Sequence, residues 1–288
     1  MKIDLHIHTT YSDGTFSPEK IVDAALNCEL DVIALTDHDN ILSYDFAQKY
    51  LNSIKNQTER KLEIIQGVEI NTLYKGYEVH ILGYFMDVNN SEFKNMLKYQ
   101  QNARVKQTKE ILKLLKTKEN IDVKYEDLKK LVAQGGSIGR PHIAKAVTAI
   151  GGTSSVIEAY SKFIHSGSNV YVERKTISPF DAVEIIYDAG GIPVFAHPFD
   201  VDIADKLILE LMTYGLRGVE AYHRKHSPAM VEYFSSIAEK NGLIVTGGSD
   251  FHSPNLNNGQ IYMGKNFVPD WIYNELLNEK KRLDLACK

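Results

Sequence analysis

Hydrophobic and polar positions alternate strictly near the start of the chain, in the segment Ile-Asp-Leu-His-Ile-His over residues 3–8. Strict alternation is the period-two pattern of a β-strand whose two faces differ. His6 and His8 therefore point to the same side, at a separation that lets two imidazoles reach one metal ion. The polar residues 9–15 predict a loop in which Asp13 folds back towards the end of the strand. A strand that carries histidines on one face indicates a metal site.

Further apolar runs predict the other strands, at 31–36, 62–70, 77–84, 192–196, 217–221 and 243–246. A single histidine is more often a hydrogen-bonded structural residue than a metal ligand. Here, however, several predicted strands contain or are followed by a histidine or an acidic residue that could bind a metal: His38, Glu69, His80, His197, Asp250 and His252. This repetition favours one shared metal site over coincidence.

Helical patterns alternate with these strands in the first and last thirds of the chain. Helices are predicted from residue 18, around 43–57, at 179–189, 202–214 and 228–241, and from 269. Alternating strands and helices predict an α/β fold with a parallel sheet, and the number of strands suits a closed or nearly closed barrel. Active-site residues of such barrels lie at the carboxyl ends of the strands, where these histidines and acids occur.

The pattern changes between residues 91 and 176, where amphipathic helical segments occur without strand patterns. They span 92–118, 124–133, 141–150 and 154–163. We therefore expect a barrel domain formed by residues 1–90 and 177–288, and a helical insertion domain formed by residues 91–176. The lysines of 106–118 are interrupted by glutamate and are interpreted as a solvated helix face.

Charge and composition exclude several classes of protein. A net charge of −4 argues against a broad nucleic-acid-coating surface, although it leaves room for a small basic pocket that binds one phosphate. The two cysteines, Cys28 and Cys287, are distant from the histidine motifs, which argues against a disulfide framework or a thiolate metal site. No apolar run has the length of a membrane span, and the chain starts directly with a strand. We therefore expect a cytoplasmic protein with no membrane contact.

These motifs together resemble the PHP (polymerase and histidinol phosphatase) family. The residues that carry the resemblance are His6-x-His8, Ser12-Asp13-Gly14, Thr36-Asp37-His38, Gly67-x-Glu69, His80, Ala196-His197-Pro198 and Gly248-Ser-Asp250-x-His252. The resemblance implies a distorted (β/α)7 TIM-like barrel, two or three divalent metal ions and hydrolysis of phosphate esters. The segment Gly139-Arg140-Pro141-His142 within the helical part resembles one branch of the family. That branch contains nucleotide phosphoesterases, including 3′,5′-nucleoside bisphosphate phosphatases and enzymes that trim RNA 5′ ends.

The resemblance also implies a role for each metal-binding residue. The first metal ion is expected to bind His6, His8, Glu69 and Asp250. Glu69 is expected to bridge to a second ion, which His80 and His197 complete. The third ion is expected to bind Asp13, His38 and His252. Imidazole and carboxylate ligands without thiolate suit Mn²⁺, Fe²⁺ or Zn²⁺, and the resemblance favours Mn²⁺.

Cationic side chains are expected to hold the substrate phosphate. Arg140 and then Arg174 are the leading candidates for catalytic and substrate-binding residues, because a planar guanidinium fits phosphate oxygens bidentately. Either arginine could instead be solvated or salt-bridged. His223 and His226 follow the predicted strand 217–221 and are candidates for substrate binding. His226 is also a candidate for protonating the leaving group, while a structural role for it stays open.

We therefore expect a phosphoesterase that hydrolyses phosphate monoesters by means of a metal-activated hydroxide. The expected substrates are 3′,5′-nucleoside bisphosphates, mononucleotides or short single-stranded RNA with a 5′ phosphate, and no protein partner is indicated. Two alternatives remain: a histidinol-phosphate phosphatase with the same metal core, or a non-catalytic metal-binding domain.

Overall fold

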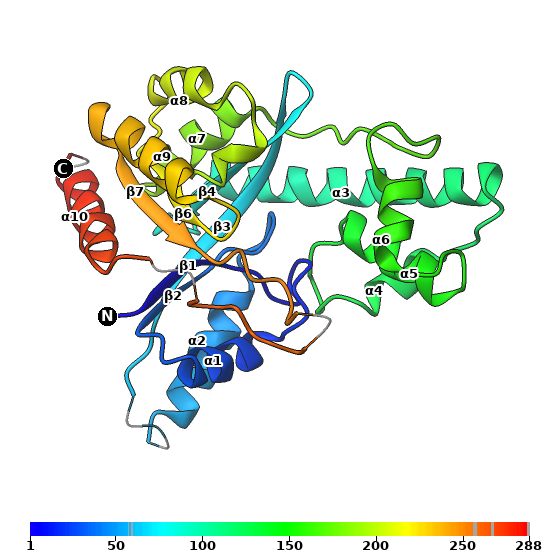
Figure 1. Cartoon of the computed structure of the whole chain (residues 1–288), viewed down its shortest axis with the longest axis horizontal. Helices are drawn as coiled ribbons and strands as arrows, with labels where there is room; N and C mark the ends of the chain where they lie inside the picture. Colours follow the sequence, from blue (N-terminus) through cyan, green and yellow to red (C-terminus); the bar gives the residue numbers. More distant parts are fainter. Residues whose placement is uncertain (57, 59, 256–257, 266–267, 287–288) are drawn as a thin grey trace.

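The computed structural model describes residues 1–56, 58, 60–255, 258–265 and 268–286. Its strands form one 7-stranded sheet in which the spatial order follows the sequence order. The sheet curls into a nearly closed barrel with helices on its outer side (Figure 1). The strands are β1 (Ile3–Ile7), β2 (Val32–Leu35), β3 (Glu63–Tyr74), β4 (Tyr77–Tyr84), β5 (Ile192–Phe195), β6 (Gly218–His223) and β7 (Ile244–Gly248).

One strand departs from the predicted parallel arrangement. β4 follows β3 through a tight turn at Lys75 and Gly76, and it pairs antiparallel with both β3 and β5. The other adjacent pairs in sequence order are parallel. The reason is the short connection, since a parallel pair needs a crossover of a dozen or more residues.

The barrel closes between β1 and the chain that follows β7. The backbone N–H of His8 donates to the carbonyl of Phe251 at 2.9 Å. Gly248 allows this approach, because a Cβ atom at this position would lie 2.4 Å from the Cβ of His6. The closure brings the first and last strands of the sequence to one rim.

The helices that cover the barrel agree with the predicted ranges to within a few residues. Ser17 and Ser178 cap two of them with their side-chain oxygens, and proline occupies the first turn of each, as the sequence predicts. These helices are α1 (Pro18–Asn27), α2 (Ser43–Ile54), α7 (Pro179–Asp188), α8 (Ala204–Met212), α9 (Pro228–Lys240) and α10 (Trp271–Ala286). A short 3₁₀-helix, η2 (Pro198–Asp200), was not predicted.

Between β4 and α7 the chain forms helices that extend to one side of the barrel (Figure 1). They are α3 (Ser91–Lys118), α4 (Tyr125–Lys129), α5 (Arg140–Ala149), α6 (Val156–Ala159) and the short π-helical η1 (Tyr160–Ile164). The two ends of α3 lie in different hydrophobic clusters. Phe93 and Leu97 pack in the barrel core, whereas Ile111 and Leu115 pack among the later helices. Arg104, in the middle of the helix, is buried between these ends.

The predicted fold class is confirmed. The end of one strand that carries a candidate site residue differs from the prediction. β6 extends to His223, so this residue lies in the strand and does not follow it as predicted. No helix in the described part of the chain is both long enough and apolar enough to cross a membrane. Cys28 has a free thiol, and Cys287 lies outside the described residues.

Candidate metal centre and adjoining cavity

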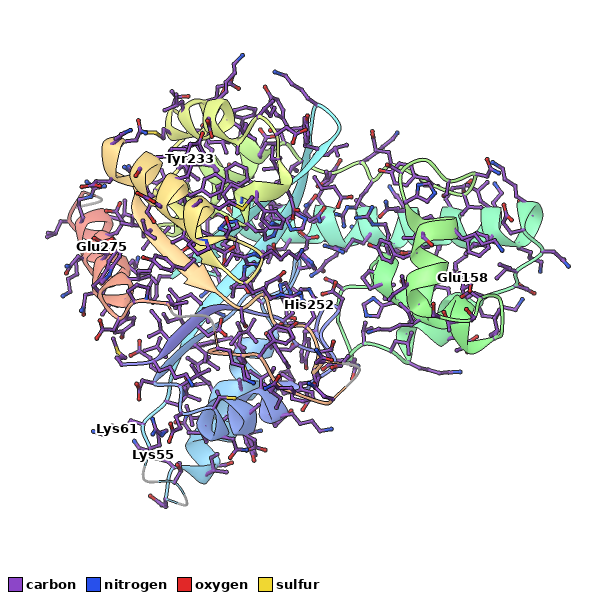
Figure 2. All side chains as sticks on the ribbon, in the orientation of Figure 1. Lys55, Lys61, Glu158, Tyr233, His252 and Glu275 are labelled. Atoms are coloured by element: carbon purple, nitrogen blue, oxygen red, sulfur yellow. The ribbon has the colours of Figure 1, made fainter. Side chains whose placement is uncertain are left out.

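The predicted metal ligands converge at one rim of the barrel. His6 lies in β1 and Glu69 in β3, and the other seven come from strand ends, the loops that follow them and β4: His8, Asp13, His38, His80, His197, Asp250 and His252. This rim holds the carboxyl ends of the parallel strands. Because β4 is antiparallel, it contributes His80 from its amino-terminal half. Figure 2 shows His252 where the barrel meets the helical segment.

Glu69 is the centre of this arrangement. Its Oε1 lies 2.8 Å from Nδ1 of His80 and 3.0 Å from Nε2 of His197. Its Oε2 lies 2.9 Å from Nδ1 of His38 and 3.2 Å from Nε2 of His8. A buried carboxylate whose two oxygens face different imidazoles is suited to bridging two cations.

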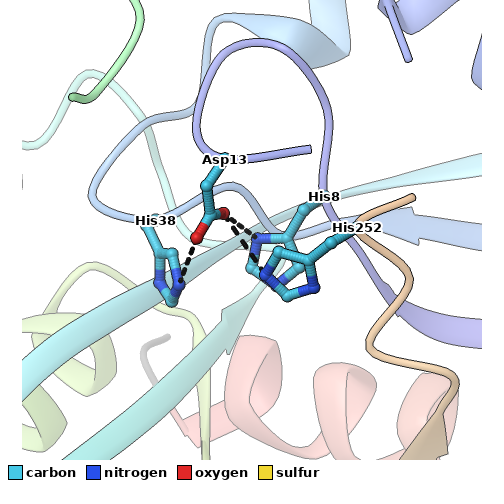
Figure 3. A group of neighbouring side chains, drawn as sticks. All are labelled: His8, Asp13, His38 and His252. Carbon is cyan, nitrogen blue, oxygen red and sulfur yellow. Dashed lines mark ion pairs between the residues drawn. The ribbon is translucent and has the colours of Figure 1, made fainter. Parts of the chain in front are cut away.

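A second group forms around Asp13 (Figure 3). Its Oδ1 lies 3.3 Å from Nε2 of His252 and 3.8 Å from Nδ1 of His8. Its Oδ2 lies 3.8 Å from Nε2 of His38. Gly14 permits the return of this loop, since a Cβ there would lie 2.5 Å from the carbonyl oxygen of His8. The loop therefore folds back onto the strand end as the sequence predicts.

A third group forms around Asp250. Its Oδ1 lies 3.3 Å from Nε2 of His8 and 3.6 Å from Nε2 of His6. Its Oδ2 lies 3.5 Å from Nε2 of His223. His8 thus contacts all three carboxylates of the centre, which links the three groups into one cluster.

The cluster has the properties of a site for divalent cations. In three sets of residues the atoms able to bind a metal all lie within 4.8 Å of one another: His8, Asp13, His38 and His252; His6, His8 and Asp250; and His38, Glu69 and His80. Several of these atoms are buried and lack a hydrogen-bond partner among the described residues: Nε2 of His6 and of His8, Nδ1 of His38, Oδ1 of Asp13 and Oε2 of Glu69. Burying polar atoms without partners is costly, and a bound cation supplies the missing partner. The residues therefore fit metal ions that accept nitrogen and oxygen ligands.

The ionisation of the carboxylates favours metal binding. Burial alone raises the pKa of Glu69, but the facing imidazoles of His38 and His80 hold that pKa well below its usual range. Burial alone lowers the pKa of His8, but the facing carboxylates of Asp250 and Glu69 raise it to about 10, so a metal ion that binds His8 displaces a proton. For His38 the effect of burial is larger than that of the nearby carboxylates of Glu69 and Asp13, and its pKa is lowered. At neutral pH the carboxylates are thus ionised and able to bind cations.

Part of the backbone strain lies at the same rim. Asp39, His197 and Asp250 adopt left-handed conformations, with φ angles of 51°, 28° and 51°. Such conformations cost a non-glycine residue about 1–3 kcal/mol and persist where the surrounding structure enforces them. Each of these residues lies within a few positions of the end of β2, β5 or β7. The strain marks the points where the chain turns to direct residues into the site.

Residues behind the candidate ligands hold them in position. Glu220 in β6 is fully buried, and its Oε1 lies 3.0 Å from Nδ1 of His6. Its Oε2 accepts the backbone N–H of His197 at 2.8 Å. Ser12, whose hydroxyl donates to Asp37, lies 3.3 Å from Nδ1 of His8. Glu220 is not among the residues predicted from the sequence, although an acidic residue within an otherwise apolar strand is a usable signal.

A cavity of about 300 Å³ joins this centre to the helical segment. Its lining includes candidate metal ligands together with Arg104, Arg140 and Arg174. Arg140 is the first residue of α5, one position before the predicted start of this helix, and its Nη2 lies 2.6 Å from Oε2 of Glu78. Arg174 contacts the side chain of Asn71. Both predicted arginines therefore face the cavity, although each already has a protein partner.

The two remaining candidates lie behind this surface. His223 reaches Asp250 but is absent from the cavity lining, as is His226. Nδ1 of His226 lies 2.6 Å from the carbonyl oxygen of Ala221, and its ring packs edge-on against Phe199. The structure thus does not bring His226 to the cavity, and contact of either histidine with substrate stays a prediction.

Comparison with known proteins identifies relatives over most of the chain. A 5′-3′ exoribonuclease of Haemophilus influenzae is 31% identical over 94% of this chain and 98% of its own length. A 3′,5′-nucleoside bisphosphate phosphatase of Chromobacterium violaceum is 28% identical over 88% of this chain and 87% of its own length. A crystal structure from Bifidobacterium adolescentis, assigned as a metal-dependent phosphoesterase, has a TM-score of 0.85 and 30% identity, covering 96% of this chain and 95% of that chain.

The fold, the cluster of possible metal ligands and these relatives define a metal-dependent hydrolase that acts on phosphoric ester bonds. The family model of the PHP domain matches residues 4–176. The chain belongs to the PHP family, as its motifs predict.

Proposed function

We propose that this phosphoesterase hydrolyses phosphate monoesters of nucleotides: 3′,5′-nucleoside bisphosphates, mononucleotides or short RNA with a 5′ phosphate. The observation that carries the proposal is the cavity that joins the metal-binding cluster to three arginines of the helical segment. Its volume of about 300 Å³ suits a small ligand, and guanidinium groups are preferred partners of phosphate. The name of the Chromobacterium relative, a nucleoside bisphosphate phosphatase, supports hydrolysis of nucleotide monoesters, and the name of the Haemophilus relative, an exoribonuclease, supports RNA as a substrate.

We propose three metal positions. His6, His8, Glu69 and Asp250 hold the first ion; Glu69, His80 and His197 hold the second; Asp13, His38 and His252 hold the third. Mn²⁺ is the proposed native ion. Bound divalent ions supply a water molecule of lowered pKa and positive charge for phosphate oxygens.

The protein's own residues complete the chemistry. Glu220 fixes the ring of His6 and the backbone of His197, so that these groups hold their positions during turnover. Arg140 and Arg174 bind oxygens of the substrate phosphate and stabilise the negative charge that develops on them. The N-terminus of α5 adds backbone N–H groups and a favourable dipole beside Arg140.

Residues 91–176 are proposed to form a domain that covers the mouth of the active site. Their separate hydrophobic cluster supports a distinct packing unit. Their contribution of Arg104, Arg140 and Arg174 to the cavity supports a direct part in substrate binding. Because nucleotides and RNA are intracellular molecules, we propose that the enzyme acts in the cytoplasm.

A substrate panel tests the proposal. The metal-free protein, reconstituted with Mn²⁺, is assayed for phosphate release from a nucleoside 3′,5′-bisphosphate, mononucleotides, a short 5′-phosphorylated RNA and histidinol phosphate. We expect turnover of one or more nucleotides, loss of activity on chelation, and recovery with Mn²⁺ exceeding that with Fe²⁺ or Zn²⁺. Preference for histidinol phosphate would refute the nucleotide assignment. Full activity at confirmed zero metal content would refute the metal assignment.

A further inference from the structure

The helical segment between β4 and α7 docks on the loop that carries Asp13. The backbone N–H of Ala133 donates to the carbonyl oxygen of Thr10 at 2.7 Å. The backbone N–H of Ser137 donates to the carbonyl oxygen of Tyr11 at 2.8 Å. Two backbone hydrogen bonds from the helical segment therefore hold the chain just before a candidate metal ligand.

The same segment also docks on the loop that contains His38. Asn40 in this loop is buried, and its side-chain amide donates to the carbonyl oxygen of Gly135 at 2.8 Å. Asp39 is fully buried, and its Oδ2 lies 2.5 Å from Nε of Arg104 in α3. A buried carboxylate is strongly dependent on such a partner. The helical segment is thus bound on both sides of the loop backbone that follows His38.

These two loops provide two of the three residues proposed to hold the third ion. Oδ2 of Asp13 lies 3.8 Å from Nε2 of His38. Within the barrel the loops are joined through Asp37, whose Oδ1 accepts the backbone N–H of Thr9 at 2.8 Å. The helical segment adds a second connection between them. The distance between the two candidate ligands therefore depends on whether the segment is docked.

We propose that docking of the helical segment on these loops assembles the third metal position, so that docking and metal occupancy stabilise each other. The inference rests on the proposed third ion and gives the helical segment a role in metal binding besides substrate binding. If docking raises the affinity of Asp13 and His38 for a cation, thermodynamic linkage requires the bound cation to favour the docked state by the same factor. Asn40 is then a positioning residue, which acts on the ion through the docked segment.

Hydrogen exchange followed by mass spectrometry measures the coupling without any substrate. The amides of Ala133 and Ser137 report on docking, because their N–H groups bind the barrel. The amide of Gly152 is the internal control, because it donates to the carbonyl oxygen of Val147 within the helical segment at 2.9 Å. Saturating Mn²⁺ should slow exchange of the two docking amides about fivefold or more and leave the control amide unchanged. No slowing, or equal slowing at all three amides, overturns the proposal.

Asp13→Asn shows which ion is responsible. In this variant Mn²⁺ should still bind the remaining positions but should no longer slow the exchange of the Ala133 and Ser137 amides. Undiminished slowing would assign the effect to another ion and overturn the coupling to the third position.

Variants of the docking loop test the coupling in the other direction. In Gly136→Ala the new Cβ atom would lie 2.9 Å from the carbonyl oxygen of Ala133 and 3.1 Å from that of Thr10, so the loop must shift against the barrel. Gly152→Ala is the matched control, since its Cβ would lie 3.0 Å from the carbonyl oxygen of Val147, inside the helical segment. In Mn²⁺ titrations the affinity for the third ion should fall about fivefold or more in Gly136→Ala and stay unchanged in the control.

The outcomes separate the coupling from the proposed metal position. Asn40→Ala, which removes the donor to Gly135, should lower the affinity for the third ion in the same way as Gly136→Ala. Normal affinity in both folded variants overturns the coupling while the metal position stands. An Asp13→Asn variant that binds as many ions as the unaltered protein overturns the third position itself. Should the loop variants unfold, hydrogen exchange in the unaltered protein decides the question.

Discussion

Nδ1 of His6 lies 3.0 Å from Oε1 of Glu220, and neither residue is exposed to solvent. The other oxygen of the same carboxylate accepts the backbone N–H of His197. One buried glutamate in β6 thus orients one proposed metal ligand by its ring and another by its backbone. A carboxylate behind a histidine fixes the tautomer and direction of the ring, so that its other nitrogen faces the metal.

Glu220→Gln should therefore weaken metal binding while the barrel stays folded. We expect a loss of about 10- to 100-fold in metal affinity, the usual effect of losing such a supporting carboxylate. Titration of the metal-free protein with Mn²⁺, followed by metal analysis, measures this directly. Glu279→Gln is the matched control, because Glu279 is also a buried carboxylate but pairs with Arg217 and Arg282. Equal affinities in both variants would exclude the supporting role of Glu220.

Asp13→Asn should remove one metal position and leave the others. The carboxylate of Asp13 faces His8, His38 and His252, and an uncharged amide of the same size cannot replace its charge. We expect the bound metal to fall by one ion per chain and turnover to fall by about two orders of magnitude. Metal analysis and kcat at saturating substrate provide the measurements. A folded variant with normal turnover would place Asp13 outside the catalytic centre.

Arg140→Ala should lower kcat/KM for nucleotides with no change in metal content. Loss of a charge-assisted bidentate contact to phosphate costs about 2–4 kcal/mol in transition-state stabilisation. Arg140→Lys should recover only part of this loss. Glu78→Gln is the discriminating control, since Arg140 is bound to Glu78 at 2.6 Å. If the arginine serves only that ion pair, the Glu78 and Arg140 variants will lose activity equally; if it binds phosphate, the Glu78 variant will retain kcat/KM.

His142 should make stability depend on pH below neutrality. Burial lowers its pKa from 6.5 to about 4, and its Nδ1 accepts the backbone N–H of Gly139 at the start of α5. Between these two pH values the unfolded chain binds a proton that the folded chain does not. Stability should therefore fall as pH decreases from 6.5 to about 4, by at most about 3 kcal/mol from this residue.

Urea unfolding at a series of pH values measures the effect against a variant that does not titrate. His142→Gln keeps an acceptor able to reach the Gly139 N–H, as glutamine does in a capping box. The free energy of unfolding of this variant should change less between pH 6.5 and 4 than that of the unaltered protein. Parallel curves for the two proteins would show that His142 contributes nothing to the acid sensitivity.

Much of the fold and the cluster followed from local patterns. The alternation around His6 and His8 predicts both the strand and the shared direction of the two rings, because side chains in a strand alternate with period two. The carboxyl ends of parallel strands meet at one rim, so residues such as His38 and Asp250 were expected together even though they are far apart in the chain. The alternation and the apolar runs that predict strands involve only residues close together in the chain, and they can therefore be recognised in the sequence.

The tertiary structure alone decided which residues support the site. The sequence contains no sign that Arg104 meets Asp39, because a lysine-rich amphipathic helix is compatible with an arginine on any face. The pairing arises because α3 spans two hydrophobic clusters, and its middle turns are thereby held against the barrel rim. Likewise the sequence does not show that His226 packs edge-on against Phe199 and is absent from the cavity lining. Contacts between distant segments depend on the packing of whole elements, which local periodicity does not encode.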